Sequence, residues 1–65
     1  MPLIDVRLYD HRVTEESVPK IIEKLTDALH EASGASKEAI HVIVTGVSPK
    51  HWGQAGKPGS PPPSA

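Results

Sequence analysis

The sequence predicts an α+β domain: a single β-α-β unit with parallel strands and a short C-terminal hairpin or arm, which assembles into an oligomer. Three observations lead to this fold class. Two stretches alternate apolar and polar residues, one near the amino terminus and one at residues 40–47. One amphipathic helical stretch lies between them. The chain has only 65 residues and no cysteine, so it needs a partner to stabilise it.

The first strand is predicted in "PLIDVRLYD", residues 2–10. Ile4, Val6 and Leu8 fall on one face, and apolar residues at a period of two are typical of a half-buried strand. The opposite face mixes apolar and charged side chains, namely Leu3, Asp5, Arg7 and Tyr9. A face of that composition is neither uniformly apolar, as a core face would be, nor uniformly polar, as a solvent-exposed face would be.

The helix is predicted between Thr14 and Gly34. Thr14 or Ser17 can cap its first turn, because a side-chain hydroxyl accepts from the free N–H groups there. Pro19 fits only near a helix start, and Gly34 is typical of a helix end. Apolar residues recur every three or four positions and form one stripe: Val18, Ile21, Ile22, Leu25, Ala28, Leu29 and Ala32. His30 falls outside the stripe, and we expect it to be a solvated helix residue.

The second strand is predicted in "IHVIVTGV", residues 40–47, after a short turn that Ser36 can cap. Since a helix separates the two strands, they should be parallel with a right-handed crossover. The helix then covers one sheet face and leaves the other open, with Leu3, Tyr9 and Ile43 on it. A two-stranded sheet with a half-apolar open face is not stable alone. We therefore expect copies of the chain to pack sheet against sheet.

A glycine-rich segment, "SPKHWGQAGKPG", follows the second strand and carries the single tryptophan, Trp52. It is predicted to form a short hairpin or an arm that reaches a neighbouring subunit. The final "SPPPSA" is of low complexity. We therefore place the folded domain at residues 1–56 and a disordered or extended Pro/Ser-rich tail at residues 57–65.

Composition and charge argue against several kinds of protein. The net charge is −1, and the clustered Lys and Arg of a nucleic-acid-binding protein are missing. The sequence shows neither an apolar run as long as a membrane span nor a signal peptide, so we expect a cytoplasmic protein without a membrane partner. Four scattered histidines lack the spacing of a metal site, so neither a metal nor a cofactor is expected: His11, His30, His41 and His51.

Pro2, directly after the initiator methionine, is the candidate catalytic residue. If Met1 is removed, Pro2 presents a secondary amine at the start of the chain. A free α-amino group has a pKa of ~7.7–8.0, close to the value that suits a general base in neutral water. Apolar walls and nearby cations would lower that pKa further. The alternative is structural, because a proline does little harm just before a strand.

Several features together resemble the 4-oxalocrotonate tautomerase family: Pro2, the arginine in "DHRVTEE", a helix leading into "IHVIVTGV", and then "HWGQAGKPG". The resemblance covers the chain from Pro2 to about Gly56. It implies the small tautomerase β-α-β fold and a homohexamer built as a trimer of dimers, or a related trimeric arrangement. It also implies that Pro2 is a general base, that Arg12 binds a substrate carboxylate and that Trp52 walls the pocket.

One position departs from the family pattern. Where the family usually has an arginine on the second strand, this chain has His41. A neutral imidazole donates one hydrogen bond and cannot hold a carboxylate with two. Arg7 falls on the same sheet face, and we hypothesise that it supplies the missing cation and changes the substrate preference. Tyr9 can pack on the open face or line the pocket. Arg12 and Trp52 also have structural interpretations, as a loop residue and an interface anchor.

The resemblance therefore predicts an isomerase that tautomerises 2-hydroxy-dienoates or enol-pyruvate-type acids. Two alternatives stay open. A superfamily hydratase or dehalogenase would keep Pro2 protonated as an acid and add a carboxylate to activate water, for which Asp5 is a candidate by its face. A non-catalytic oligomeric subunit would need neither residue.

Overall fold

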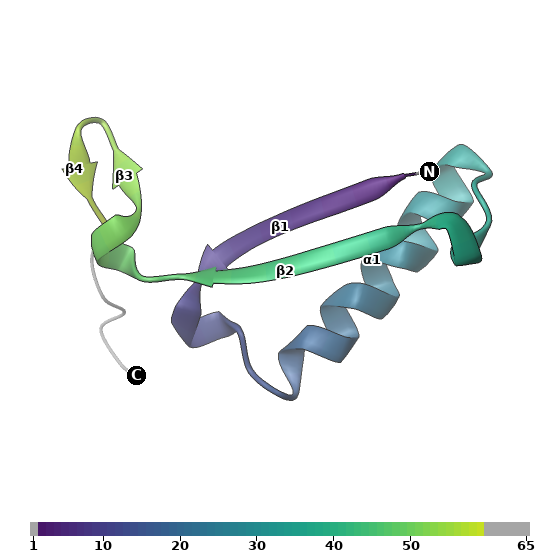
Figure 1. The fold of residues 1–65 in the computed structure, drawn as a ribbon, viewed down its shortest axis with the longest axis horizontal. Helices are drawn as coiled ribbons and strands as arrows, with labels where there is room; N and C mark the ends of the chain where they lie inside the picture. Colours follow the sequence, from purple (N-terminus) through teal and green to yellow (C-terminus); the bar gives the residue numbers. More distant parts are fainter. Residues whose placement is uncertain (1, 60–65) are drawn as a thin grey trace.

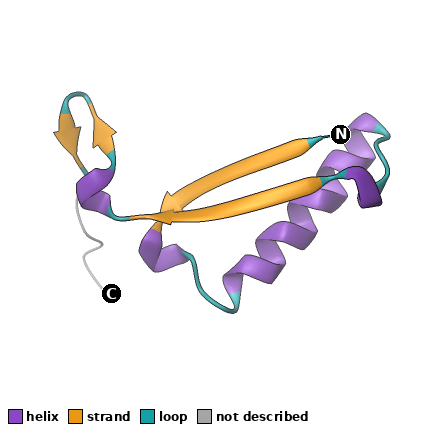
Figure 2. Cartoon of the chain, viewed as in Figure 1, coloured by secondary structure: helices purple, strands orange, loops and turns teal. Residues whose placement is uncertain are grey.

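The computed structural model describes residues 2–59, and their elements follow the predicted order (Figures 1 and 2). The two long strands and the helix between them are β1 (Leu3–Tyr9), α1 (Ser17–Ser33) and β2 (His41–Val47), and a small hairpin follows, made of β3 (Gly53–Gln54) and β4 (Lys57–Pro58). Within these residues three short 3-10 turns connect the elements: η1 (Asp10–Arg12), η2 (Lys37–Ala39) and η3 (Pro49–His51). The α+β fold class, with one β-α-β unit and a C-terminal hairpin, is confirmed.

The two long strands pair in parallel, as predicted. Their register sets Leu3 beside His41 at one end and Tyr9 beside Val47 at the other. The backbone N–H of His41 also donates to the Pro2 carbonyl at 2.9 Å. Because strand side chains alternate between faces, paired residues share a face. The register therefore divides the sheet into a face that α1 covers and a face that is open.

α1 runs along one face of the sheet, diagonally to the strands (Figure 1). Little of the chain is buried even so: among residues 2–59 only Ile40 and Pro49 fall in the buried class. Three members of the predicted apolar stripe of α1 are exposed, namely Ile22, Ala28 and Ala32. Two strands side by side are only ~5 Å apart, which is too narrow to cover the whole apolar side of a helix. The open sheet face is barer still, since Leu3 is 59% and Ile43 51% exposed.

The start of α1 is held by two hydroxyls that bond reciprocally. Thr14 N–H donates to Ser17 Oγ at 3.0 Å, and Ser17 N–H donates to Thr14 Oγ1 at 2.9 Å. Ser17 Oγ also donates to the Arg12 carbonyl at 2.6 Å and ties the end of η1 to the helix. Thr14 therefore caps the first residue of α1 as predicted, whereas the Ser17 hydroxyl bonds back to the residues before the helix. The predicted cap at Ser36 is wrong, because its side chain makes no capping hydrogen bond to η2.

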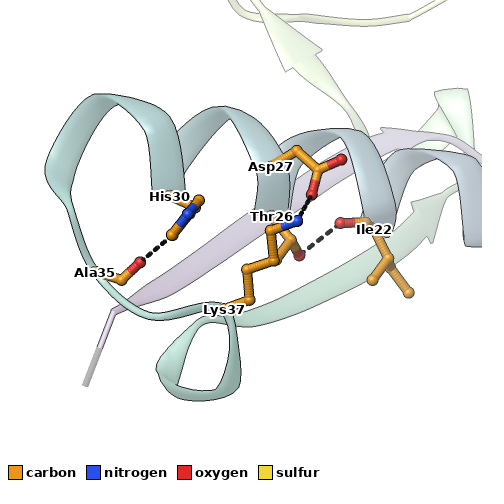
Figure 3. Close-up of polar contacts among 6 residues, drawn as sticks. All are labelled: Ile22, Thr26, Asp27, His30, Ala35 and Lys37. Atoms are coloured by element: carbon orange, nitrogen blue, oxygen red, sulfur yellow. Dashed lines mark hydrogen bonds and ion pairs between the residues drawn. The ribbon is translucent and has the colours of Figure 1, made fainter.

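The end of α1 is closed by a left-handed residue and a histidine. Gly34 has φ +80° and donates its N–H to the His30 carbonyl at 3.0 Å, as a helix-ending glycine does. His30 is exposed, as expected, and its Nδ1 also donates to the Ala35 carbonyl at 2.7 Å across this end (Figure 3). Lys37 Nζ lies 2.9 Å from Asp27 Oδ1, and this hydrogen bond and charge raise the pKa of Lys37. These contacts hold the turn before β2 against the helix.

The C-terminal segment folds into the predicted hairpin. Its two-residue turn has Ala55 at φ 54° and Gly56 at φ 78°, and two positive φ values match the twist of the flanking strands. β4 continues the ordered chain past residue 56, and the remainder of the predicted tail, residues 60–65, lies outside the described residues.

Ser17→Ala should lower the free energy of unfolding by about 1–2 kcal/mol, because it removes the two hydrogen bonds that join the Ser17 hydroxyl to the Thr14 N–H and the Arg12 carbonyl. Urea unfolding at a fixed protein concentration measures this. Ser36→Ala is the matched control and should change the free energy by less than about 0.5 kcal/mol. Equal losses in the two variants would contradict the capping geometry.

Candidate active site

The residues predicted for the site fall into two groups at opposite ends of the sheet. Pro2 and His41 lie at the start of β1 and β2. Arg7 and Trp52 lie toward the other end, and Arg12 is in η1 beyond it. Five strand positions separate Pro2 from Arg7, which is roughly 17 Å at ~3.3 Å per residue. One chain therefore does not bring all of these residues to one place.

The amino-end group consists of Pro2 and His41. Pro2 is half-buried and its carbonyl accepts from the His41 N–H, so the backbone of one residue fixes the backbone of the other. The His41 side chain is exposed and shares the open face with Leu3, its partner in the register. His41 is thus the polar side chain on that face nearest in register to Pro2.

A pocket of about 280 Å³ lies toward the other end of the open face. It is lined by Arg7 from β1, Val47 from β2, His51 and Trp52 from η3 and the residue after it, and Gly53 from β3. The alternation of β1 and β2 puts Arg7 and Val47 on the same face. The turn after β2 then brings His51 and Trp52 beside them. We call this site the Arg7 pocket.

The Arg7 pocket combines positive charge with an aromatic wall. The Arg7 guanidinium lies 3.7 Å from Asp5 Oδ2, and both side chains are exposed, so this long pair contributes little. A planar guanidinium can hold a carboxylate with two hydrogen bonds, and His51 adds a further donor. The Trp52 indole offers a flat apolar surface. The arrangement suits a small unsaturated carboxylate.

Besides Pro2 and His41, two further residues predicted for the site, Arg12 and Tyr9, do not line the Arg7 pocket. Arg12 is exposed in η1, on the turn that follows β1. Tyr9 packs its ring against Trp52, with the centroids 5.1 Å apart and the planes at 85°. Arg7 and His41 share a face, but Arg7 pairs with Thr45, four positions along β2 from His41. Within one chain, Arg7 therefore does not stand in for a cation at the position of His41.

Sequence reasoning missed three residues that line the pocket: Val47, His51 and Gly53. Val47 could have been found, because strand alternation puts it on the same face as Thr45 and Arg7. His51 could not, because the side on which it lies depends on the 3-10 turn between β2 and β3.

Residues 2–59 contain no group of three or more His, Cys, Asp or Glu side chains placed to hold a metal ion. Over the same residues, no helix has both the length and the apolar character that crossing a membrane takes. The ionisable side chains that line the Arg7 pocket are those of Arg7 and His51.

Comparison with known proteins identifies the family. A family model described as "Tautomerase enzyme" matches residues 2–60. The crystal structure of TomN, a 4-oxalocrotonate tautomerase homologue in the tomaymycin biosynthetic pathway, is 37% identical with a TM-score of 0.80, and the match covers 88% of this chain and 86% of that chain. The chain belongs to the 4-oxalocrotonate tautomerase family.

Two further relatives agree with this assignment. A probable tautomerase of Staphylococcus aureus (strain Mu50 / ATCC 700699) is 36% identical over 56 residues, which are 86% of this chain and 90% of the relative. A structure from work on the 4-oxalocrotonate tautomerase isozymes of Methylibium petroleiphilum is 38% identical, with a TM-score of 0.76, and the match covers 85% of this chain and 87% of that chain. The resemblance noted from the sequence is confirmed, and the chain is a tautomerase, an isomerase of small molecules.

Arg7→Ala should weaken binding of a small 2-oxo dicarboxylate, such as 2-oxoglutarate, by roughly ten- to hundredfold, because it removes a charged hydrogen-bond donor. Quenching of the single tryptophan, Trp52, gives the dissociation constant directly. Arg7→Lys should lose less affinity than Arg7→Ala, since lysine keeps the positive charge but lacks the planar guanidinium that makes two hydrogen bonds to a carboxylate. Lys20→Ala is the control for loss of one positive charge, on α1. If Lys20→Ala weakened binding as much as Arg7→Ala, the pocket would not be the anion site.

Proposed function

We propose that the chain tautomerises 2-hydroxy-dienoates or enol-pyruvate-type acids, with Pro2 as the general base after removal of Met1. One observation carries the proposal: the Arg7 pocket and the amino-end group of Pro2 and His41 lie on or beside the same open sheet face. The relatives support the reaction class, since two of the similar structures are described as 4-oxalocrotonate tautomerase homologues or isozymes. Met1 itself lies outside the described residues.

We place the complete site between copies of the chain. The length of β1 separates Pro2 from the Arg7 pocket within one chain, so a second copy must supply one of the two groups. The exposed Leu3 and Ile43 favour the same conclusion, because an apolar sheet face of this kind has to be covered. The assembly we propose is a homohexamer, a trimer of dimers.

The chemistry is a proton transfer between two atoms of the substrate. The lone pair on the Pro2 nitrogen takes the proton of the 2-hydroxyl group, and the ammonium that forms returns a proton to a carbon of the conjugated chain. No atom is gained or lost, so no second reactant is required. The apolar indole of Trp52 and the charge of Arg7 would both disfavour the ammonium, lower the pKa of Pro2 and keep it a base in neutral water.

The cations then have separate roles in this proposal. Arg12, which is exposed on η1, binds a substrate carboxylate. Arg7 binds the substrate in the Arg7 pocket, beside Trp52. His41, beside Pro2, donates a hydrogen bond to the oxygen on which negative charge develops. A neutral imidazole in that place favours substrates that do not need a second strong cation next to the reacting carbonyl.

Pro2→Ala should lower kcat/KM by at least ~100-fold in ultraviolet assays of 2-hydroxymuconate and phenylenolpyruvate ketonisation, because a positioned general base contributes that much. Pro19→Ala, which changes an exposed proline of α1, should keep the activity. Mass spectrometry of the active enzyme should show Met1 absent. Full activity with Met1 retained would refute the role of Pro2.

The pH profile decides between a base and an acid at Pro2. For a base, kcat/KM should rise with pH as the Pro2 nitrogen loses its proton and should level off above its pKa. A profile that falls over the same range, with activity toward water addition, would instead support the hydratase or dehalogenase alternative. Absence of both activities would support a non-catalytic subunit.

Mixed oligomers test the sharing of the site. Pro2→Ala and Trp52→Ala chains should each be inactive alone. Refolded together in equal amounts, they should recover about a quarter of the wild-type activity, because random mixing pairs an intact Pro2 with an intact Trp52 in that share of the sites. If both groups came from one chain, every site would lack one of them and the mixture would stay inactive.

A further inference from the structure

We infer that Tyr9 is a positioning residue that holds the Trp52 indole against the Arg7 pocket without touching the substrate. The inference rests on the proposed function only in taking the Arg7 pocket as the place where substrate binds. Its structural part, a fixed indole, is independent of the reaction. It also gives a role to Gly59, which lies close to the Tyr9 hydroxyl.

The first observation is the ring geometry. Tyr9 is the last residue of β1 and lies on the same face as Arg7, yet it does not line the pocket. Its ring meets the Trp52 indole edge to face, at a centroid distance of 5.1 Å and an angle of 85°. This is a preferred geometry for an aromatic pair. Trp52 therefore contacts the Tyr9 ring and also lines the Arg7 pocket.

The second observation is that the backbone of Trp52 is held on both sides. Its N–H donates to the Pro49 carbonyl at 3.2 Å, and its own carbonyl accepts from the Gly59 N–H at 2.7 Å. The Gly59 N–H is also 2.9 Å from the Pro49 carbonyl, and Pro49 is one of the few buried residues of the described chain. The backbone contacts fix the position of the Trp52 main chain, and the contact with the Tyr9 ring fixes the orientation of the indole.

The third observation is the close approach of Gly59 to Tyr9. A Cβ built on Gly59 would overlap the Tyr9 hydroxyl and come within 2.9 Å of Tyr9 Cζ and 3.1 Å of the Pro49 carbonyl oxygen. A side chain at position 59 would therefore require the Tyr9 ring to shift. The end of the hairpin segment thus closes against Tyr9 and prevents its ring from moving away from Trp52.

A fixed indole affects substrate binding more than the chemical step. A side chain that is already ordered loses no further rotamer freedom when a ligand binds, so its contact area is gained at lower entropic cost. The same indole contact is made before and during the proton transfer. Loss of Tyr9 leaves the indole at the pocket but less ordered, so its effect on the pKa of Pro2 stays. KM should therefore rise while kcat stays nearly unchanged.

The first experiment replaces Tyr9 in the full chain. Tyr9→Leu should raise KM roughly three- to tenfold for whichever assay substrate is turned over, with little change in kcat, because the edge-to-face pair is lost. Tyr9→Phe keeps the ring and should restore KM to within about twofold of wild type. Trp52 is the only tryptophan, so its near-ultraviolet circular dichroism and fluorescence anisotropy should fall in Tyr9→Leu and stay in Tyr9→Phe.

The second experiment uses the close approach at Gly59. Gly59→Ala should disturb the Trp52 spectra and raise KM, since the added methyl group pushes on the Tyr9 hydroxyl. In a Tyr9→Phe background, Gly59→Ala should change the Trp52 spectra and KM less, because the hydroxyl oxygen that the methyl group would overlap is absent. Gln54→Ala is the control, because Gln54 is exposed in β3 of the same hairpin and does not line the Arg7 pocket, and it should leave the Trp52 spectra unchanged.

The outcomes separate this inference from the proposed function. Unchanged Trp52 spectra in Tyr9→Leu, or equal effects of Gly59→Ala in both backgrounds, would overturn the positioning role. A fall in kcat with unchanged KM would overturn it as well and would assign Tyr9 to the chemical step. If Pro2 proved not to be the base, the spectra and the binding of 2-oxoglutarate would still test the positioning of Trp52.

Discussion

The open face of a two-stranded sheet is the constraint on which the rest of this protein depends. One helix and two strands bury so little that Leu3 and Ile43 stay more than half exposed, on a part of the face that no element within residues 2–59 covers. The same face carries Arg7 and His41. A surface that must be covered for stability and also holds the candidate site couples assembly to function: whatever covers the apolar residues also completes or blocks the polar ones.

The parallel register sets which residues lie at each end of this face. The backbone bond between Pro2 and His41 sets the start of the sheet, and seven residues of strand carry the chain from there to Tyr9. At that far end the turn after β2 folds Trp52 back over the face. The strand thus keeps a candidate base and a candidate anion pocket apart within one chain, and in the assembly that we propose a second copy brings the two together.

Much of the fold could be predicted because it depends on residues that are close in the sequence. Alternation in β1, spacing in α1 and the glycine at its end all result from local backbone and side-chain preferences. Pro2 as a candidate base likewise needed no structure. The contacts that could not be predicted lie across a turn: His30 also bonds to Ala35, and the Ser36 side chain does not cap η2. A periodic pattern indicates which side of an element a residue lies on but not which carbonyl lies opposite.

By itself the sequence determined the elements, their order and the parallel pairing, since these follow from hydrophobic periodicity and from the helix between the strands. Its resemblance to known tautomerases indicated the family. Only the tertiary structure decided that Tyr9 lies against Trp52 and not in the pocket, and that His51 joins Arg7 there. Those contacts join the end of β1 to the segment after β2. They depend on the exact path of η3 and the hairpin through space, which no local preference sets.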